Sequence, residues 1–290
     1  MTAIAFVGTG VMGSSIVKHL LKAGHEVTVY TRTKSKAQQL IDLGATWADT
    51  PAQASVDKDI IFTMVGYPQD VEEVYCGKDS IFDTAKKGAV VVDMTTSEPT
   101  LAKKLYNIAL EKGIHCVDAP VSGGDIGAQN GTLSIMIGGD SSVVESIRPI
   151  FETFGTNVVY QGEAGAGQHT KMCNQIAIAA GMIGVCESIF YGLKAGLKME
   201  DVLQSISSGA AGSWSLSNLA PRVLQGNLEP GFYIKHFIKD MKIALDEAEQ
   251  MNIQLPGLQL AKKMYDTLLE QGYGENGTQA LIKYYEEKMS

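Results

Sequence analysis

The first residues in this 290-residue chain whose types and spacing could bind a ligand form a glycine-rich stretch directly after a short apolar run, Ile4 to Val7. The stretch opens a segment with helical spacing of apolar residues and reads Gly8-Thr9-Gly10-Val11-Met12-Gly13. In such a strand–turn–helix corner, the first glycine allows the tight turn, the second lets a pyrophosphate approach, and the third lets the helix pack on the sheet. Free N–H groups at the helix start would bind the phosphates. The stretch therefore predicts a dinucleotide site, with a plain structural corner as the alternative.

The second predicted strand, Val27 to Tyr30, is followed by hydroxyl and cationic side chains. NAD-binding sites usually place an acid there for the ribose hydroxyls, and none is present. Arg32 offers a planar donor fork for a 2′-phosphate. The side chains that would assist it are Thr31, Thr33 and Lys36. We predict that NADP(H) is favoured over NAD(H); the alternative is that these side chains only cover an exposed loop.

The elements that must position these residues alternate in the first part of the chain. The apolar patterns predict strands at residues 4–7, 27–30, 59–65, 89–93, 116–118, 133–137 and 158–160, and helices at residues 11–22, 35–43, 71–75, 101–112 and 143–154. This alternation implies right-handed crossovers and a mostly parallel sheet. After Gly162 only helices are predicted, at residues 167–195, 199–208, 236–251 and 256–271. We therefore expect an α/β Rossmann N-terminal domain, residues 1–163, and an all-α C-terminal domain, residues 164–290.

The bulk composition excludes several classes of protein. The net charge of −8 argues against nucleic acid or an anionic membrane as partner. The four cysteines contain no CxxC pair and the histidines lack metal-ligand spacing, so we expect no disulfide framework and no metal site. No basic segment precedes the first strand, and the uncharged stretch from Met172 to Cys186 is too short for a membrane span. These features predict a cytoplasmic protein.

Four separated blocks give the chain a resemblance to a known family. They are FVGTGVMG at 6–13, DAPVSGGDIGAQNGTLSIMIGG at 118–139, GAGQHTKMCNQ at 165–175 and IKDMKIALDEA at 238–248. With these blocks in this order, the chain resembles the beta-hydroxyacid dehydrogenase family over essentially its full length. The resemblance implies a Rossmann domain joined to a helical domain by a long helix, and usually a homodimer or homotetramer. One departure is Gln175, where part of the family carries a second asparagine.

The resemblance assigns roles to residues in the later blocks. Lys171 would donate a proton to the substrate carbonyl oxygen, or accept one from the hydroxyl in the reverse direction. It precedes fifteen uncharged residues, a setting in which altered ionisation is useful, although most helix lysines are solvated. Asn174 would share its helix face and hold the lysine or the substrate hydroxyl. The loop for the substrate carboxylate would be Ser122, Gly123 and Gly124, whose backbone N–H groups suit an acid.

The resemblance also assigns cofactor contacts outside the glycine-rich loop. These are Met64 and Val65 after the third strand, Thr96 near the nicotinamide, and Lys239. For Lys239 the alternative is a charged surface shared with Lys235 and Lys242.

The implied function is an NADP(H)-dependent oxidoreductase. It would interconvert a small 3-hydroxy or 2-hydroxy acid and its semialdehyde or keto acid by hydride transfer. Two alternatives stay open: an imine reductase-like enzyme, which shares the architecture but generally lacks the lysine, and a non-catalytic dinucleotide-binding module.

Overall fold

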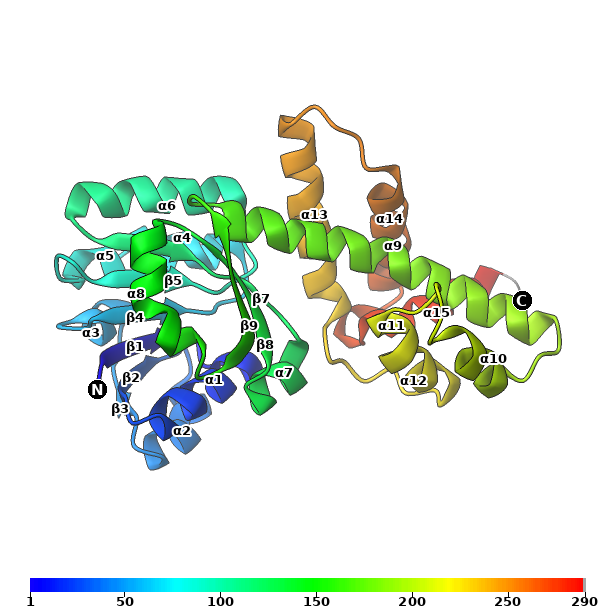
Figure 1. The fold of residues 1–290 in the computed structure, drawn as a ribbon, viewed down its shortest axis with the longest axis horizontal. Coiled ribbons are helices and arrows are strands. Elements are labelled where there is room, and N and C mark those ends of the chain that lie inside the picture. Colours follow the sequence, from blue (N-terminus) through cyan, green and yellow to red (C-terminus); the bar gives the residue numbers. More distant parts are fainter. Residues whose placement is uncertain (289–290) are drawn as a thin grey trace. The chain divides into compact units, whose positions relative to one another are not determined.

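The computed structural model describes residues 1–288, and the chain divides into two compact units, Met1–Lys171 and Met172–Ser290 (Figure 1). The division falls inside helix α9 (Ala166–Lys194). The sequence pattern placed the boundary between residues 163 and 164, at the turn before this helix. The first turns of α9 group with the first unit because their backbone hydrogen-bonds to Asp118 of the sheet.

A nine-stranded sheet forms the centre of the first unit. Its strands are β1 (Ala3–Val7), β2 (Glu26–Tyr30), β3 (Thr46–Trp47), β4 (Ile60–Thr63), β5 (Val90–Asp93), β6 (His115–Asp118), β7 (Val121–Ser122), β8 (Leu133–Gly138) and β9 (Gly155–Gly162). The order is β3-β2-β1-β4-β5-β6-β8-β7, with β9 beside β8. The six neighbouring strands β3-β2-β1-β4-β5-β6 are parallel, while β8 runs antiparallel to β6 and β7. The chain reverses direction across the sheet between β1 and β4, which is where ligands bind in such folds.

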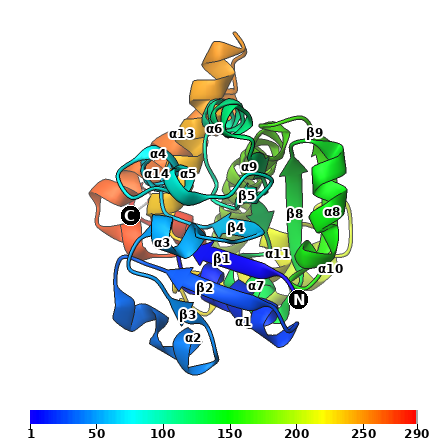
Figure 2. The same ribbon diagram turned by 90° about the vertical axis from the view of Figure 1, so that its left-hand side faces the viewer.

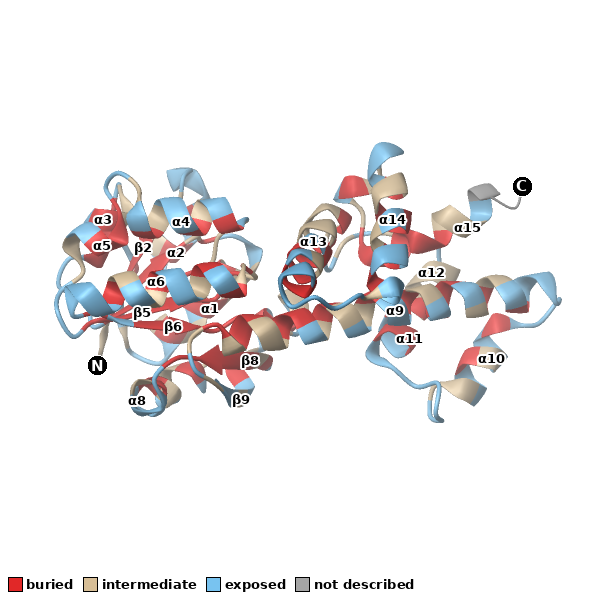
Figure 3. Ribbon diagram, turned by 90° about the horizontal axis from the view of Figure 1, so that it is seen from above, coloured by how far each residue is buried: buried red, intermediate tan, exposed pale blue. Residues whose placement is uncertain are grey.

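Helices cover both faces of this sheet. They are α1 (Val11–Lys22), α2 (Gln38–Asp42), α3 (Pro51–Ser55), α4 (Pro68–Cys76), α5 (Ile81–Thr84), α6 (Pro99–Lys112), α7 (Gly124–Asn130) and α8 (Ser141–Phe151). Alternate residues of β1 point to opposite faces: Ile4 and Phe6 join a core with α1, α7 and α8, and Ala5 and Val7 join a core with α4, α5 and α6 (Figure 2). The central strands β1, β4 and β5 are almost entirely buried, whereas most of β9 is not (Figure 3). Burial on both faces explains the continuous apolar runs of the central strands.

The second unit is helical. Besides the greater part of α9 it contains α10 (Met199–Ile206), α11 (Trp214–Asn218), α12 (Ala220–Leu224), α13 (Ile234–Gln250), α14 (Pro256–Glu270) and α15 (Ile282–Lys288). Phe237 of α13 and Tyr265 of α14 meet edge to face in its core, with ring centroids 5.2 Å apart. By length and composition alone, α9 could cross a membrane. Its Met182 and Cys186 are nevertheless fully buried in this core, as in the central helix of a globular unit.

The long periodic elements match the sequence-based expectations. Helix α1 has the predicted bounds, and residues 172–288 contain no strand apart from the isolated bridge between Tyr233 and Gly277. The predicted helix at 35–43 consists of a 3-10 turn, Lys34–Ala37, followed by α2. The elements missing from the prediction, such as β3, α3, α5, β7 and α7, have two to seven residues. Such pieces are too short to show a period.

Candidate active site

The glycine-rich loop after β1 has three glycines in three different environments. Gly8 adopts φ +101°, and a Cβ there would lie 2.2 Å from the carbonyl oxygen of Met64. A Cβ on Gly13 would lie 2.2 Å from the carbonyl oxygen of Gly8. A Cβ on Gly10 would meet nothing within 4 Å. The first and third glycines are thus required by packing, whereas the second borders open space at the start of α1.

The surroundings of this loop fit a dinucleotide. The loop follows β1 and touches Met64, which follows β4, so it lies at the switch point of the sheet. Gly10 is the N-cap of α1, and no side chain caps the free N–H groups of that helix. Among residues 1–288, the Thr9 hydroxyl is one of the few buried polar atoms without a hydrogen-bond partner. Open space, free N–H groups and an unsatisfied hydroxyl are what a bound pyrophosphate requires.

The residues expected at a 2′-phosphate lie at the end of β2. Thr31 is half-buried, and Arg32, Thr33 and Lys36 are exposed. The Arg32 guanidinium lies 3.6 Å from the carboxylate of Asp70. Asp70 also accepts a hydrogen bond from the backbone N–H of Tyr67, the N-cap residue of α4. Sequence reasoning missed Asp70; the proline at the start of the helix and the acid in its first turn would have placed Asp70 at a helix start, but not opposite Arg32.

Hydrogen bonds join the segments that follow β4 and β5. The N–H of Val65 donates to the Thr95 hydroxyl at 3.0 Å. Thr96 is half-buried next to it. Asp93 ends β5 and accepts hydrogen bonds from the Thr63 hydroxyl and from the N–H of Thr95. Burial raises the pKa of Asp93 to about 6, although these hydrogen bonds act in the opposite direction. Met64, Val65 and Thr96 are thus held at one edge of the sheet.

Lys171 and the proposed carboxylate loop lie close together in the first unit. Lys171 is 7% exposed, and its Nζ donates a hydrogen bond to the carbonyl oxygen of Val121 at 2.8 Å. Val121 directly precedes the half-buried Ser122. Gly123 and Gly124 follow with φ values of +127° and +64°, which a non-glycine residue adopts with strain. The structure therefore brings the lysine ammonium to the residue that directly precedes Ser122 and the glycine turn.

In the second unit, two other predicted residues belong to one polar chain. Asn174 donates to the side-chain oxygen of Gln175 at 2.7 Å, and Gln175 donates to Asp240 at 2.6 Å. The other carboxylate oxygen of Asp240 lies 3.1 Å from Nζ of Lys239. Gln175 and Asp240 are almost fully buried. Sequence reasoning had assigned neither of them a role, because their contact joins residues 65 positions apart.

Lys239 does not belong to a solvated charged surface. Its side chain is 12% exposed, compared with 36% for Lys235 and 64% for Lys242. Trp214 is 66% exposed and does not pack into the core of the helical unit.

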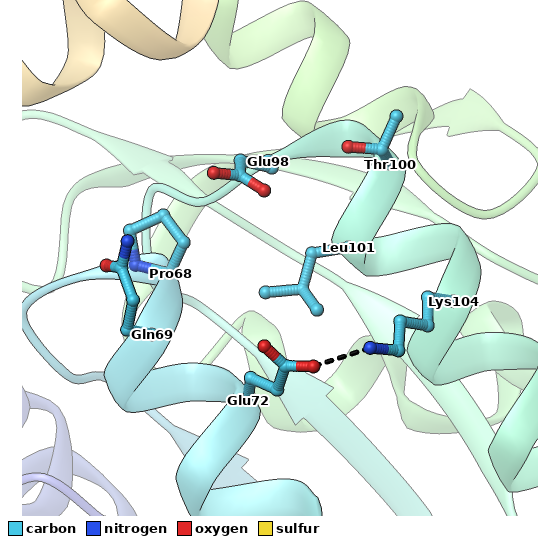
Figure 4. A pocket seen from close by; sticks show the side chains of 7 residues that line it. All are labelled: Pro68, Gln69, Glu72, Glu98, Thr100, Leu101 and Lys104. Atoms are coloured by element: carbon cyan, nitrogen blue, oxygen red, sulfur yellow. Dashed lines mark hydrogen bonds and ion pairs between the residues drawn. The ribbon is translucent and has the colours of Figure 1, made fainter.

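A surface pocket elsewhere on the first unit contains none of the predicted site residues. It lies between α4 and the start of α6, and Figure 4 shows the ion pair between Glu72 and Lys104 across it. Its lining residues are Pro68, Gln69, Glu72, Glu98, Thr100, Leu101 and Lys104. Glu72 and Lys104 pair with each other beside the aliphatic side chain of Leu101, so the pocket holds no set of catalytic residues.

Comparison with known families assigns both units of the chain. Residues 3–162 match the family described as the NAD binding domain of 6-phosphogluconate dehydrogenase. Residues 165–285 match the family described as NAD-binding of NADP-dependent 3-hydroxyisobutyrate dehydrogenase.

Full-length relatives agree with these matches. A protein of Arabidopsis thaliana, named "Probable 3-hydroxyisobutyrate dehydrogenase-like 1, mitochondrial", is 48% identical over 97% of this chain and 84% of its own length. The 2-hydroxy-3-oxopropionate reductase of Escherichia coli is 36% identical over 98% of this chain and 97% of its own length. A solved structure of the Mycobacterium tuberculosis 3-hydroxyisobutyrate dehydrogenase with L-serine superposes with a TM-score of 0.90, at 27% identity and 98% coverage of both chains.

Proposed function

The chain belongs to the beta-hydroxyacid dehydrogenase family, and from this premise we propose that it interconverts a small 3-hydroxy or 2-hydroxy acid and its semialdehyde or keto acid with NADP(H). Family membership makes it a pyridine-nucleotide-binding oxidoreductase that acts on hydroxy acids. The proposal adds the cofactor preference, the proton donor and the substrate-binding groups.

The observation that carries the proposal is the contact between Lys171 and Val121, which places an ammonium group beside the Ser122–Gly124 loop. The loop offers a hydroxyl and backbone N–H groups, which bind a carboxylate through charge-assisted hydrogen bonds. A substrate with a carboxylate and a nearby carbonyl would thus be held at one end by the loop and protonated at the other by Lys171.

The proton transfer follows from the chemistry of lysine. A lysine ammonium is ordinarily protonated at neutral pH, so in reduction Lys171 donates a proton to the carbonyl oxygen as that oxygen gains charge. In oxidation Lys171 must be neutral before it accepts the hydroxyl proton. A bound nicotinamide would supply the hydride to the carbonyl carbon in reduction and would take it from the hydroxyl-bearing carbon in oxidation. Asn174, one turn further along α9 and bonded to Gln175, would hold the substrate hydroxyl or the lysine.

The preference for NADP(H) rests on the end of β2. Arg32 is exposed and can bind a 2′-phosphate, with the hydroxyls of Thr31 and Thr33 beside it. No acid follows β2 to take the ribose hydroxyls of NAD(H).

We further propose a homodimer or homotetramer in the cytoplasm. The helical unit exposes several large apolar side chains, including Tyr191 at 75%, Leu193 at 55% and Leu197 at 49%, and self-association would cover such a surface. All four cysteines are free, as expected in a reducing compartment. Light scattering in solution measures the oligomeric state directly.

The decisive experiment compares Lys171→Ala with the wild type in NADPH oxidation. Its substrates are succinic semialdehyde, glyoxylate, methylmalonate semialdehyde and tartronate semialdehyde. We expect the kcat of Lys171→Ala to fall by about 10²- to 10⁴-fold, the usual contribution of a positioned acid, with NADPH affinity within twofold of wild type. Lys104→Ala, which removes an exposed lysine of α6, is the control and should keep wild-type turnover.

Three results would reject the proposal. Wild-type turnover by Lys171→Ala would remove the lysine from the reaction. Turnover of a cyclic imine with none of the four carbonyl substrates would favour the imine reductase alternative. If NADPH raises the melting temperature and nothing is turned over, the chain is a binding module.

A further inference from the structure

A buried carboxylate of the sheet caps the helix that carries Lys171. Asp118 ends β6 and is 4% exposed. Its Oδ1 accepts a hydrogen bond from the N–H of Gly165 at 2.7 Å, and its Oδ2 accepts one from the N–H of Gln168 at 2.8 Å. These donors belong to the free N–H groups at the start of α9, which an anion stabilises through hydrogen bonds and the helix dipole.

The space around this carboxylate is closely fitted. A Cβ on Gly138 would lie 2.5 Å from Oδ1 of Asp118, and a Cβ on Gly167 would lie 2.9 Å from Oδ2. Any larger residue at these positions would displace the carboxylate or the helix. Burial raises the pKa of Asp118, while the bonds from Gly165 and Gln168 favour its charged form. The arrangement therefore fixes the first turn of α9 in one place on the sheet.

Gln168 ties the same turn to the segment after β5. Its side chain is fully buried. The Oε1 atom accepts a hydrogen bond from the N–H of Ser97 at 3.0 Å, and Nε2 donates to the carbonyl oxygen of Thr95 at 2.7 Å. Between these two residues lies Thr96, the residue expected near the nicotinamide. Gln168 thus holds both neighbours of Thr96 against the helix.

Lys171 makes the third connection, one turn further along. Asp118 and Val121 are three residues apart on one segment, and Gln168 and Lys171 are three residues apart on the helix. The pairs are joined in parallel, Asp118 to Gln168 and Val121 to Lys171. All these residues belong to the first unit, and the next residue after Val121 is Ser122 of the carboxylate loop.

From these contacts we propose that Asp118 and Gln168 are positioning residues for the hydride-transfer reaction. Together they set the place of Lys171 Nζ relative to two other groups, the Ser122–Gly124 loop and Thr96. The inference rests on the proposed function, in which Lys171 is the proton donor. Asp118 acts by fixing where the helix starts, and Gln168 acts by fixing the Thr95–Ser97 segment to that start. If Asp118 and Gln168 only stabilised the fold, replacing them would reduce the fraction of folded protein but would leave the position of Lys171 in the folded molecules unchanged.

The experiment uses Asp118→Asn and Gln168→Met in the full-length protein. Asn keeps the shape but replaces one acceptor oxygen with a donor, so it loses one of the two helix N–H bonds. Met keeps the length of Gln168 but loses both of its hydrogen bonds. Asp83→Asn is the control, because Asp83 also accepts a backbone N–H at a helix start, in the capping box of α5, which carries no predicted site residue.

We expect both variants to lose about 10- to 100-fold in kcat/KM, since a misplacement of about 1 Å can cost that much. The rates are normalised to the protein that binds NADPH in a fluorescence titration, so unfolded molecules do not count. The KM of the aldehyde should rise, the pH profile of kcat/KM should shift from that of the wild type, and the dissociation constant of NADPH should stay within twofold. Asp83→Asn should keep the wild-type KM and pH profile.

Lys171→Ala, measured in parallel, distinguishes a failure of the proposed function from a failure of the positioning role. If it is inactive while both variants keep the wild-type KM and pH profile after normalisation, the proposed function stands and the positioning role is overturned. If Lys171→Ala turns over like the wild type, the proposed function fails and the positioning role fails with it. Should Asp118→Asn not fold, Gln168→Met gives the same readouts with the helix cap intact.

Discussion

Replacing Asp93 with asparagine should stabilise the first unit at neutral and alkaline pH, with little effect in acid. Asp93 is 5% exposed at the end of β5, and its burial raises its pKa from 3.8 to about 6. The folded state therefore binds the proton more tightly than the unfolded state. Stability from this group is present in full below about pH 4, falls as the pH rises to about 6, and does not return at higher pH.

The size of the effect follows from the two pKa values. A difference of about two units between the pKa of Asp93 in the folded state and in the unfolded state corresponds to about 3 kcal/mol in the free energy of unfolding. Roughly half of that change in the free energy of unfolding falls between pH 5 and pH 7.5. Asparagine keeps an oxygen that accepts from Thr63 and Thr95 but carries no charge. The stability of Asp93→Asn relative to wild type should thus rise by roughly 1.5 kcal/mol between these pH values.

The assay follows the first unit alone. The chain has two tryptophans, Trp47 in β3 and Trp214 in α11, so a Trp214→Phe background leaves Trp47 as the fluorescent reporter. Urea unfolding of this background and of its Asp93→Asn variant at pH 5 and pH 7.5 gives the four free energies required. A difference between the two proteins that is the same at both pH values would refute the reasoning, because the burial of a charge would then not control the stability.

Further predictions concern the cofactor site. Arg32→Ala should weaken NADPH binding by about 10-fold or more and NADH binding little, given about 1.5 to 3 kcal/mol for a charge-assisted hydrogen bond. The neighbouring Lys34→Ala, whose ammonium lies over the ring of Trp47, should change both alike in the same titrations; equal losses of both cofactors in Arg32→Ala would contradict the assignment. Asp70→Asn removes the carboxylate 3.6 Å from Arg32 and should raise the preference for NADPH in the ratio of the two dissociation constants, whereas an unchanged ratio would show that Asp70 does not compete for Arg32. Gly10→Ala should fold with the wild-type melting temperature and bind NADPH more weakly, since its Cβ enters open space. Gly13→Ala should lower the melting temperature, because its Cβ would lie 2.2 Å from a carbonyl oxygen, and the reverse pattern would disprove the division of roles among the glycines.

Local patterns were sufficient to predict the elements that bear the site. The strand before Gly8 is a continuous apolar run, helix α1 is long enough to show its period, and both were placed within one residue. The glycine-rich loop was predicted from its residue types and its place after a strand, and the role of Lys171 was predicted from the family resemblance. The short β7 and α7 around Ser122 were not predicted, since their backbone is set by the positive φ values of Gly123 and Gly124 and by pairing with β8.

The sequence by itself determined that a Rossmann unit precedes a helical one, because that order depends on local periodicity. It also predicted a dinucleotide loop from its glycines and, through the family resemblance, a lysine that would transfer a proton. Only the tertiary structure decided which of those residues meet. Asp70 lies opposite Arg32, Asp118 caps the start of α9, and Asp240 accepts a hydrogen bond from Gln175. Each of these pairs is brought together by the packing of elements distant in the sequence, and no local pattern records such a contact. The physical reason is that hydrogen bonds and ion pairs act over a few ångströms in space, whatever the separation along the chain.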